Sequence, residues 1–136
     1  MIRLSNVFKE IFSKVNALPY NVYDEVSQEP ENPHIRIDYA YELDNSGKNY
    51  DGITYFQYIH VFSTYKGRKE VLTIADDVIN ALSEDIETDE FVAYPHLERN
   101  EIMTESDNGG GSVNGYHANE TYRHAVIVYK YTIYKK

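Results

Sequence analysis

Apolar and polar residues follow two different periods along this chain, and the changes of period divide it into helices and strands. Residues 4–15 have helical spacing, with apolar positions at Leu4, Val7, Phe8, Ile11, Phe12 and Val15. This pattern predicts an amphipathic helix that ends before Leu18-Pro19. A second helix is expected to begin near Arg68, with one apolar stripe made of Val71, Leu72, Ala75, Val78, Ile79 and Leu82.

Three segments alternate with period two and predict strands. The first covers residues 34–44 and has one apolar row, made of Ile35, Ile37, Tyr39, Tyr41 and Leu43. The second, residues 53–64, is bulky on both faces, so we expect a central strand or one whose second face is covered by a neighbouring subunit. The third, residues 123–135, is the longest. Residues 90–105 contain Pro95, which predicts a broken strand or an edge strand.

The order of helix, strands, helix and strands predicts an α+β fold. We expect a single compact domain over residues 1–136, with an antiparallel or mixed sheet and both helices packed on one face. Two segments rich in glycine and asparagine, about 44–52 and 106–120, are predicted to be mobile loops that become ordered on assembly.

Composition narrows the functional classes. The chain has 14 Tyr, five Phe and no Trp, which suits half-buried sheet faces and protein interfaces, although strand propensity explains the same bias. The absence of cysteine excludes thiol nucleophiles, cysteine-ligated metals and disulfides. Without a signal-like or membrane-length apolar run, we expect a protein made in the cytoplasm that does not enter a membrane.

The formal net charge is −9, which argues against binding a nucleic-acid duplex by charge neutralisation. The carboxylates crowd one stretch, whose members include Glu84, Asp85, Glu87, Asp89, Glu90, Glu98 and Glu101. The ordinary interpretation of this stretch is a solvated acidic face. The basic residues Lys66, Arg68 and Lys69 precede the second helix, where a solubilising turn is the ordinary interpretation.

No pattern in the sequence indicates catalysis. The five histidines lack zinc-ligand spacing, and Gly109 to Gly115 match no phosphate-binding loop. There is no G-x-S-x-G motif, and adjacent acids such as Asp76 and Asp77 point about 100° apart on a helix. We therefore expect no catalytic residue, no cofactor and no metal.

Two segments carry a family resemblance. The strand ending Val61-Phe62-Ser63-Thr64 runs through the short basic turn at 65–68 into a helix that opens Lys69-Glu70-Val71-Leu72-Thr73-Ile74-Ala75-Asp76. Earlier, Val22-Tyr23-Asp24-Glu25-Val26 is followed by Pro33-His34-Ile35. Together with the closing strand, these segments resemble the tail-completion proteins of long-tailed bacteriophages, which include tail terminators and tail-to-head joining proteins.

The resemblance implies a non-enzymatic virion protein at the head-proximal end of the tail. Such a protein would form a ring, commonly of six subunits, that ends the tail tube or joins it to the head connector. Its partners would be its own copies, the tail-tube protein and the connector protein, while DNA would only pass through. The candidate subunit interface is Tyr58, His60, Phe62, Lys66 and Arg68, since a strand with two bulky faces should leave one partly uncovered.

The acidic stretch has a possible place in this picture, because an acidic channel wall would repel the passing phosphates. We therefore treat the seven acids from Glu84 to Glu101 as a candidate channel face. The alternative class is a small α+β ligand-binding protein or enzyme, whose pocket would lie between sheet and helices.

Overall fold

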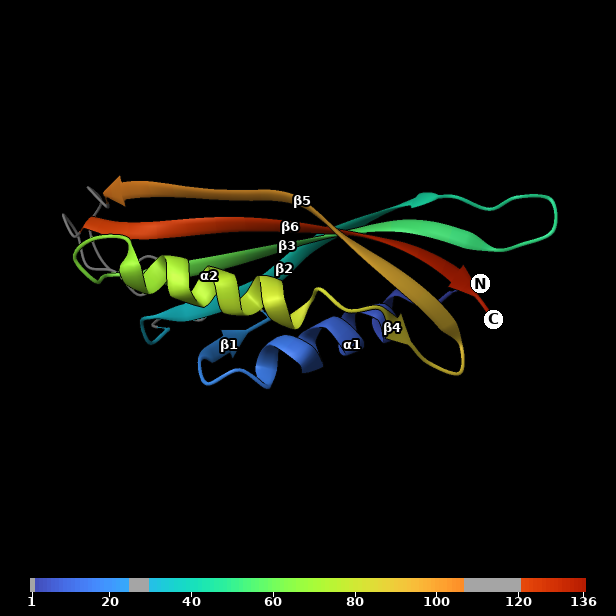
Figure 1. The fold of residues 1–136 in the computed structure, drawn as a ribbon, viewed down its shortest axis with the longest axis horizontal. Helices are drawn as coiled ribbons and strands as arrows, with labels where there is room; N and C mark the ends of the chain where they lie inside the picture. The colour runs from blue at the N-terminus through green and yellow to red at the C-terminus, as the bar shows by residue number, and fades with distance from the viewer. Residues whose placement is uncertain (1, 25–29, 107–120) are drawn as a thin grey trace.

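The computed structural model describes residues 2–24, 30–106 and 121–136 (Figure 1). Its elements are α1 (Leu4–Asn16), β1 (Asn21–Tyr23), β2 (His34–Asp44), β3 (Gly52–Ser63), α2 (Lys69–Ala81), β4 (Ile86–Glu87), β5 (Phe91–Ser106) and β6 (Thr121–Lys135). The strands form one sheet in the order β1-β2-β3-β6-β5-β4, with β1 parallel to β2 and every other pair antiparallel. The predicted α+β fold with a mixed sheet is confirmed.

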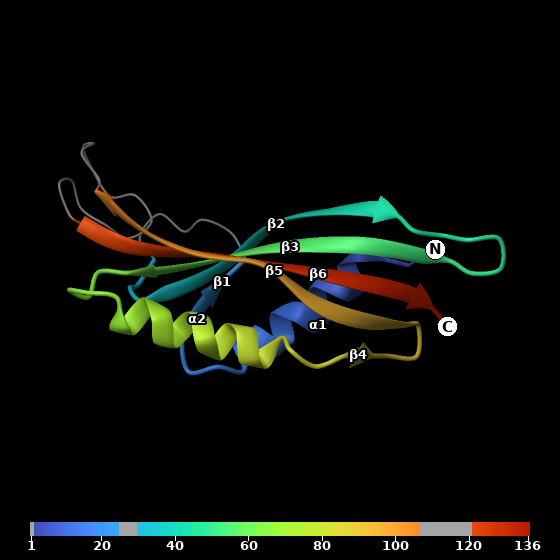
Figure 2. The same ribbon diagram turned by 45° about the horizontal axis from the view of Figure 1, so that its top comes forward.

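Both helices lie on the same side of the sheet (Figures 1 and 2). The apolar stripes predicted for them supply the core, with Val7, Ile11 and Val15 buried on α1 and Val71 and Val78 buried on α2. Leu4 and Leu72 are the exceptions, since they are 38% and 41% exposed. We call the covered side of the sheet the helix face and the other side the open face.

Side-chain hydroxyl groups fasten the helical layer to its surroundings. Tyr129 on β6 donates a hydrogen bond to the carbonyl oxygen of Ile79 at 2.9 Å. Tyr20, in the segment after α1, donates to the Asp77 carboxylate on α2. That hydrogen bond, with burial and the negative charge of Asp77, raises the pKa of Tyr20 to about 12. None of the helices described is long and apolar enough to cross a membrane.

Strand β5 continues through Pro95, which pairs in register with Tyr131. It runs from Phe91 to Ser106 beside β6, and its register shifts between Leu97 and Arg99. On its other side only Val92 and Ala93 pair with a described strand, the short β4. Most of the outer edge of β5 thus has no described partner, in agreement with the edge-strand alternative. The broken-strand alternative is wrong, because β5 is continuous from Phe91 to Ser106 and its register shift lies beyond Pro95.

Strand β2 departs from its simple alternation. Its register on β3 shifts between Ile37, which faces Ile59, and Ala40, which faces Gln57. Two residues of β2 thus oppose one residue of β3, which is a β-bulge. The bulge reverses the faces of everything beyond it, so Tyr39, Tyr41 and Leu43 leave the row of Ile35 and Ile37. The prediction that these five residues share one face is wrong.

Strand β3 is central, as its two bulky faces predict, with β2 on one side and β6 on the other. Its residues Tyr55, Ile59 and Val61 belong to the core on the helix face. The alternate residues, Thr54, Phe56, Tyr58, His60 and Phe62, therefore lie on the open face. The predicted loop at 44–52 joins β2 to β3 and projects from one end of the sheet (Figure 1). Most of the other predicted loop, residues 107–120, lies outside the described part of the chain.

Candidate interaction surface

The open face carries two groups of aromatic side chains, and the first is centred on Phe62. His34, Phe62 and His124 are direct neighbours across β2, β3 and β6. Their rings stack, with centroids 4.9 Å apart for His34 and Phe62 and 4.4 Å apart for Phe62 and His124. The Arg36 guanidinium carbon lies 5.1 Å from the Phe62 ring centroid, within reach of a cation–π interaction. We call these four residues the Phe62 cluster.

Phe62 is buried by these neighbours, with only 1% of its surface exposed. The expectation that Tyr58, His60 and Phe62 are all partly uncovered is therefore wrong for Phe62. It holds for Tyr58 and His60, whose side chains are half-buried. His60 lies next to the Phe62 cluster, since its Nδ1 is 2.8 Å from His124 Nε2. A hydrogen bond at that distance requires one of the two rings to be a neutral acceptor.

The Phe62 cluster makes folding sensitive to acid through His34. Burial, followed by the nearby charges of Arg36 and His124, lowers the His34 pKa from 6.5 to about 4. Between those two values the unfolded chain binds a proton that the folded chain does not, so stability rises with pH across this window and is lost as the pH falls from 6.5 toward 4. Below that window the full loss of folding stability has occurred, and above it the His34 imidazole is neutral in both the folded and the unfolded chain.

We predict that His34→Phe, which keeps a ring against Phe62, has a shallower acid dependence than the natural chain. The difference between the two unfolding free energies should change by about 2–3 kcal/mol between pH 7 and pH 4. Urea unfolding at several pH values measures it, and the other titrating groups cancel in the comparison. Parallel curves for the two proteins would contradict a neutral, buried His34.

The second aromatic group lies on the open face beyond the bulge, and we call it the tyrosine cluster. The Tyr39 and Tyr58 rings meet edge to face with centroids 5.0 Å apart. The Tyr41 and Phe56 rings stack at 4.6 Å. Tyr39 is 57% exposed and Tyr41 38% exposed, so the cluster offers apolar area to a partner. Sequence reasoning placed Tyr39 and Tyr41 on the wrong face, because nothing in the pattern of β2 itself marks the bulge.

The basic candidates Lys66 and Arg68 lie in the turn between β3 and α2 and are exposed. Gly67 has φ +96, a conformation that favours glycine and lets the strand turn into the helix within a few residues. Ser63 stabilises the turn by donating to Glu70 Oε1 at 2.6 Å and accepting from the backbone N–H of Tyr65 at 3.1 Å. These contacts give the basic turn a structural role, and it does not join the aromatic groups on the open face.

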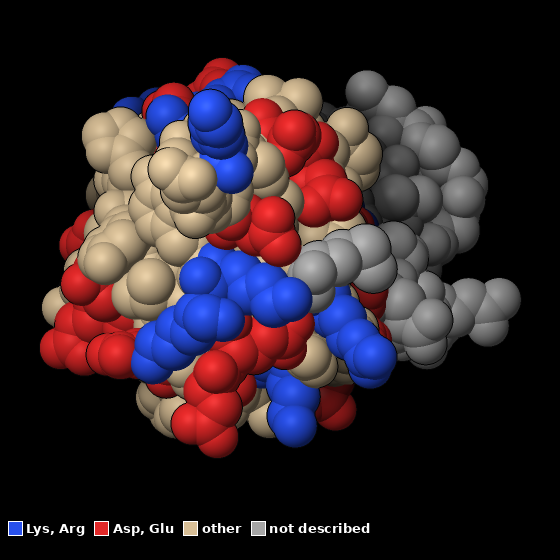
Figure 3. Space-filling view, turned by 90° about the vertical axis from the view of Figure 1, so that its right-hand side faces the viewer, with Lys and Arg blue, Asp and Glu red and all other residues tan. Residues whose placement is uncertain are grey.

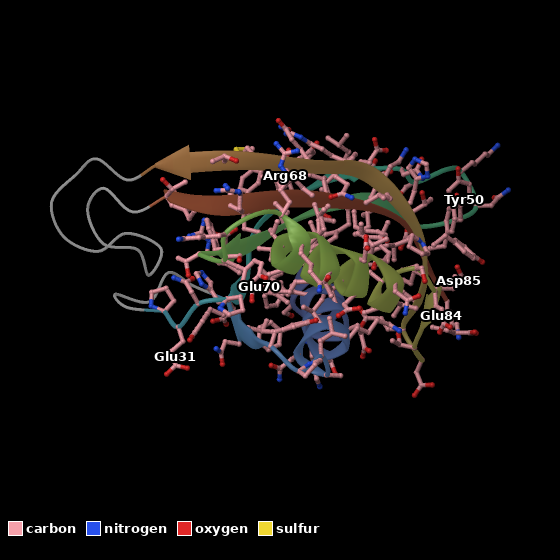
Figure 4. All side chains as sticks on the ribbon, turned by 60° about the vertical axis from the view of Figure 1, so that its left-hand side comes forward. Glu31, Tyr50, Arg68, Glu70, Glu84 and Asp85 are labelled. Atoms are coloured by element: carbon pink, nitrogen blue, oxygen red, sulfur yellow. The ribbon has the colours of Figure 1, made fainter. Side chains whose placement is uncertain are left out.

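The acidic candidates divide into two groups. Glu84, Asp85, Glu87, Asp89 and Glu90 lie between α2 and β5, and Figure 4 shows Glu84 and Asp85 beyond the end of α2 that is far from Arg68. Glu98 and Glu101 belong to the middle of β5. The structure therefore places the seven candidate residues in two separate parts of the chain, the segment between α2 and β5 and the middle of β5.

Basic partners accompany both acidic groups. Lys136 Nζ lies 2.8 Å from Glu87 Oε1, and the Glu90 carboxylate accepts hydrogen bonds from the Arg3 backbone N–H and the Asn6 amide. These contacts lower the pKa of Glu87 and of Glu90. On β5, Arg99 pairs with Glu101 and Lys130 with Glu98. Figure 3 shows Lys and Arg side chains gathered between Asp and Glu side chains at one end of the molecule.

The hollows of the described chain lie at its margins. One of about 850 Å³ is lined by the start of α1 and by the β2–β3 hairpin, including Arg3, Glu42 and Asp51. Another of about 320 Å³ lies beside the start of α2 and includes Tyr20 and Lys69. In the part of the chain described, no group of three or more His, Asp or Glu side chains is arranged to hold a metal ion. The interaction surface with the clearest chemistry is therefore the open face.

Comparisons with known proteins identify a matching family and a similar fold. The profile of the family described as "Tail completion protein gp17" matches residues 12–126. Among solved structures, a chain of the "Virion of native gene transfer agent (GTA) particle" has a similar fold, with a TM-score of 0.62 and 14% sequence identity over 91% of this chain and 91% of that chain. At this identity the likeness concerns the fold. No curated protein matches the sequence.

Proposed function

The chain belongs to the tail completion protein family, and from this premise we propose that it forms a ring at the head-proximal end of a phage tail. The family makes it a structural protein of the tail. In the proposal, the ring ends the tail tube or joins it to the head connector, commonly with six copies, and the tail-tube and connector proteins are its further partners. The protein acts by contact rather than by catalysis, and the genome passes through without specific binding.

The single observation that carries the self-association is the tyrosine cluster. A bundle of exposed aromatic rings on a sheet face without a helix is the kind of patch that marks a protein contact. Tyr58 and His60 remain interface candidates beside Tyr39 and Tyr41. Phe62, which is buried in the isolated chain, is proposed to support that surface through the neighbouring His60, whose ring centroid lies 6.2 Å from its own. Lys66 and Arg68, which lie away from these rings, are proposed for contacts at the strand-to-helix turn.

We predict that Tyr58→Asp leaves a folded monomer but prevents ring formation, because assembly would bury an unpaired charge. Leu72→Asp is the matched control, since Leu72 is exposed on α2, away from the open face. Sedimentation of both variants, with complementation of a phage that lacks the gene, measures the effect. Rings and infectious particles from Tyr58→Asp would place the contact elsewhere, whereas failure of both variants would indicate a defect in folding.

The acidic channel wall remains a proposal in a narrower form. Glu84, Asp85 and Asp89 are exposed on the segment between α2 and β5, and they would repel DNA if this segment lined the opening of the ring. Glu98 and Glu101 are proposed for the wall of the channel if the open face turns inward, although Lys130 and Arg99 beside them reduce the net charge there.

A further inference from the structure

Both ends of the main sheet have an open backbone edge. On β2, the described partner β1 pairs only with residues 34–36, so the outer edge of residues 38–44 has no described strand beside it. On β5, β4 pairs only with residues 92–93, which leaves the outer edge of residues 94–106 in the same condition. Such edges present rows of N–H and C=O groups that can pair with another chain.

Exposed apolar side chains concentrate on these two runs. Nine large hydrophobic residues of the described chain are exposed, and five of them lie there: Tyr39, Tyr41 and Leu43 on β2, and Tyr94 and Leu97 on β5. Natural proteins usually protect an open edge from pairing. An open edge that is long and apolar favours pairing with a strand of another chain. The concentration on both edges, rather than on one, indicates two halves of one contact.

Strand directions allow the two edges to meet. From β2 through β3 and β6 to β5 every neighbouring pair is antiparallel, so β5 runs antiparallel to β2 within one chain. When copies are related by rotation about an axis along the strands, β5 of one copy remains antiparallel to β2 of the next. The contact is heterologous, joining different surfaces, and heterologous contacts form a ring when the rotation between copies closes.

We propose that the open edge of β5 in one copy pairs antiparallel with residues 38–44 of β2 in the next copy, so that the sheet continues around the ring. This inference rests on the ring proposed above and specifies its contact. The neighbouring β5 would then lie beside the tyrosine cluster, and its own open-face residues would cover Tyr39 and Tyr41. The backbone supplies the hydrogen bonds, and the aromatic rings supply the buried apolar area.

Charge supports this pairing over pairing of β2 with a second β2. Residues 38–44 carry three acids, Asp38, Glu42 and Asp44, and no base. Two β2 edges would therefore place like charges opposite one another, which is destabilising. The β5 edge also carries acids, Glu98, Glu101 and Glu105. Arg99 lies beside Glu101, and Lys130 of the adjacent strand lies beside Glu98, so part of the negative charge is offset there and the repulsion from β2 is smaller.

Disulfide trapping tests the contact in a chain that has no cysteine of its own. Directly opposed residues of an antiparallel pair have Cα atoms about 4.5–5.5 Å apart, which is within the range of about 4.4–6.8 Å that a disulfide spans. Leu43→Cys, on the open-face side of β2, would be combined in turn with a cysteine at one open-face position of β5. These positions are Tyr94, His96, Arg99, Glu101 and Met103.

We expect at least one double variant to give, on mild oxidation, a ladder of covalent multimers larger than a dimer, with most of the chain in the ladder. Each single-cysteine variant should remain uncrosslinked, because a heterologous contact does not bring identical residues together. Glu42→Cys is the matched control, since Glu42 lies on the opposite face and should not crosslink with the same partners. The β5 position that reacts best gives the register.

Sedimentation of the same samples separates this inference from the proposed function. Rings that form without a crosslink in any double variant would overturn the edge pairing and leave the ring intact. A covalent dimer from Leu43→Cys alone would also overturn it, because it would indicate pairing of β2 with β2. Protein that stays monomeric under all conditions, including in the presence of tail tubes, would overturn the ring and the edge pairing together.

Discussion

Phe62→Ala is expected to destabilise the isolated, folded chain by about 3–5 kcal/mol, the range for truncating a buried phenylalanine. The ring is 1% exposed and lies between His34 and His124. Its removal opens a cavity between the two histidines. The denaturant midpoint should fall with little change in the slope of unfolding free energy against urea, since the variant alters stability rather than the surface exposed on unfolding.

Tyr58→Ala provides the comparison on the same strand and the same face. Its side chain is half-buried, so its truncation should cost roughly half as much or less. If Phe62→Ala were as stable as the natural chain but failed to assemble, Phe62 would be a contact residue and its burial in the monomer would be wrong. Equal losses for the two variants would contradict the division of the open face into a buried cluster and an exposed one.

The sequence predicts the elements of this fold well because their signals are local. The helical stripe that contains Val7 and Ile11 and the two bulky rows of β3 each follow from side-chain periodicity within a dozen residues. Pro95 likewise favours an edge strand by a local rule, and most of the outer edge of β5 has no described partner. The pairing of one strand with another is not predicted by such local signals, because the paired residues are far apart in the sequence.

The candidate surface depends on such distant pairing, and there the sequence is insufficient. Phe62 lies on the open face as its alternation predicts, but its burial depends on His34 and His124, which come from two other strands. The exposed Tyr39 and Tyr41 result from one extra residue in β2, and that bulge has no signature in the pattern of β2 itself. A possible signal is Gln57 on β3, a polar residue in the buried row between Tyr55 and Ile59.

Gln57 connects this buried row to the bulge through three hydrogen bonds. Its side chain is fully buried, and its Oε1 accepts from the Tyr55 hydroxyl at 2.7 Å. Its Nε2 donates to the carbonyl oxygen of Tyr39 at 3.0 Å and to that of Tyr58 at 3.1 Å. The bond to Tyr39 satisfies a backbone carbonyl at the bulge, where the regular pairing of β2 with β3 is interrupted. Gln57 thereby stabilises the conformation that places Tyr39 and Tyr41 on the open face.

Gln57→Leu keeps a similar volume but leaves the Tyr55 hydroxyl and the Tyr39 carbonyl without this partner. Each buried, unsatisfied group costs about 1–3 kcal/mol, so we expect a total loss of about 2–4 kcal/mol in the free energy of unfolding. Adding Tyr55→Phe should recover about 1 kcal/mol or more, because it removes the stranded hydroxyl. Urea unfolding of the single and double variants measures both quantities. If the double variant were less stable than Gln57→Leu by the full cost of Tyr55→Phe alone, the two side chains would act independently, and Gln57 would not connect the core to the bulge.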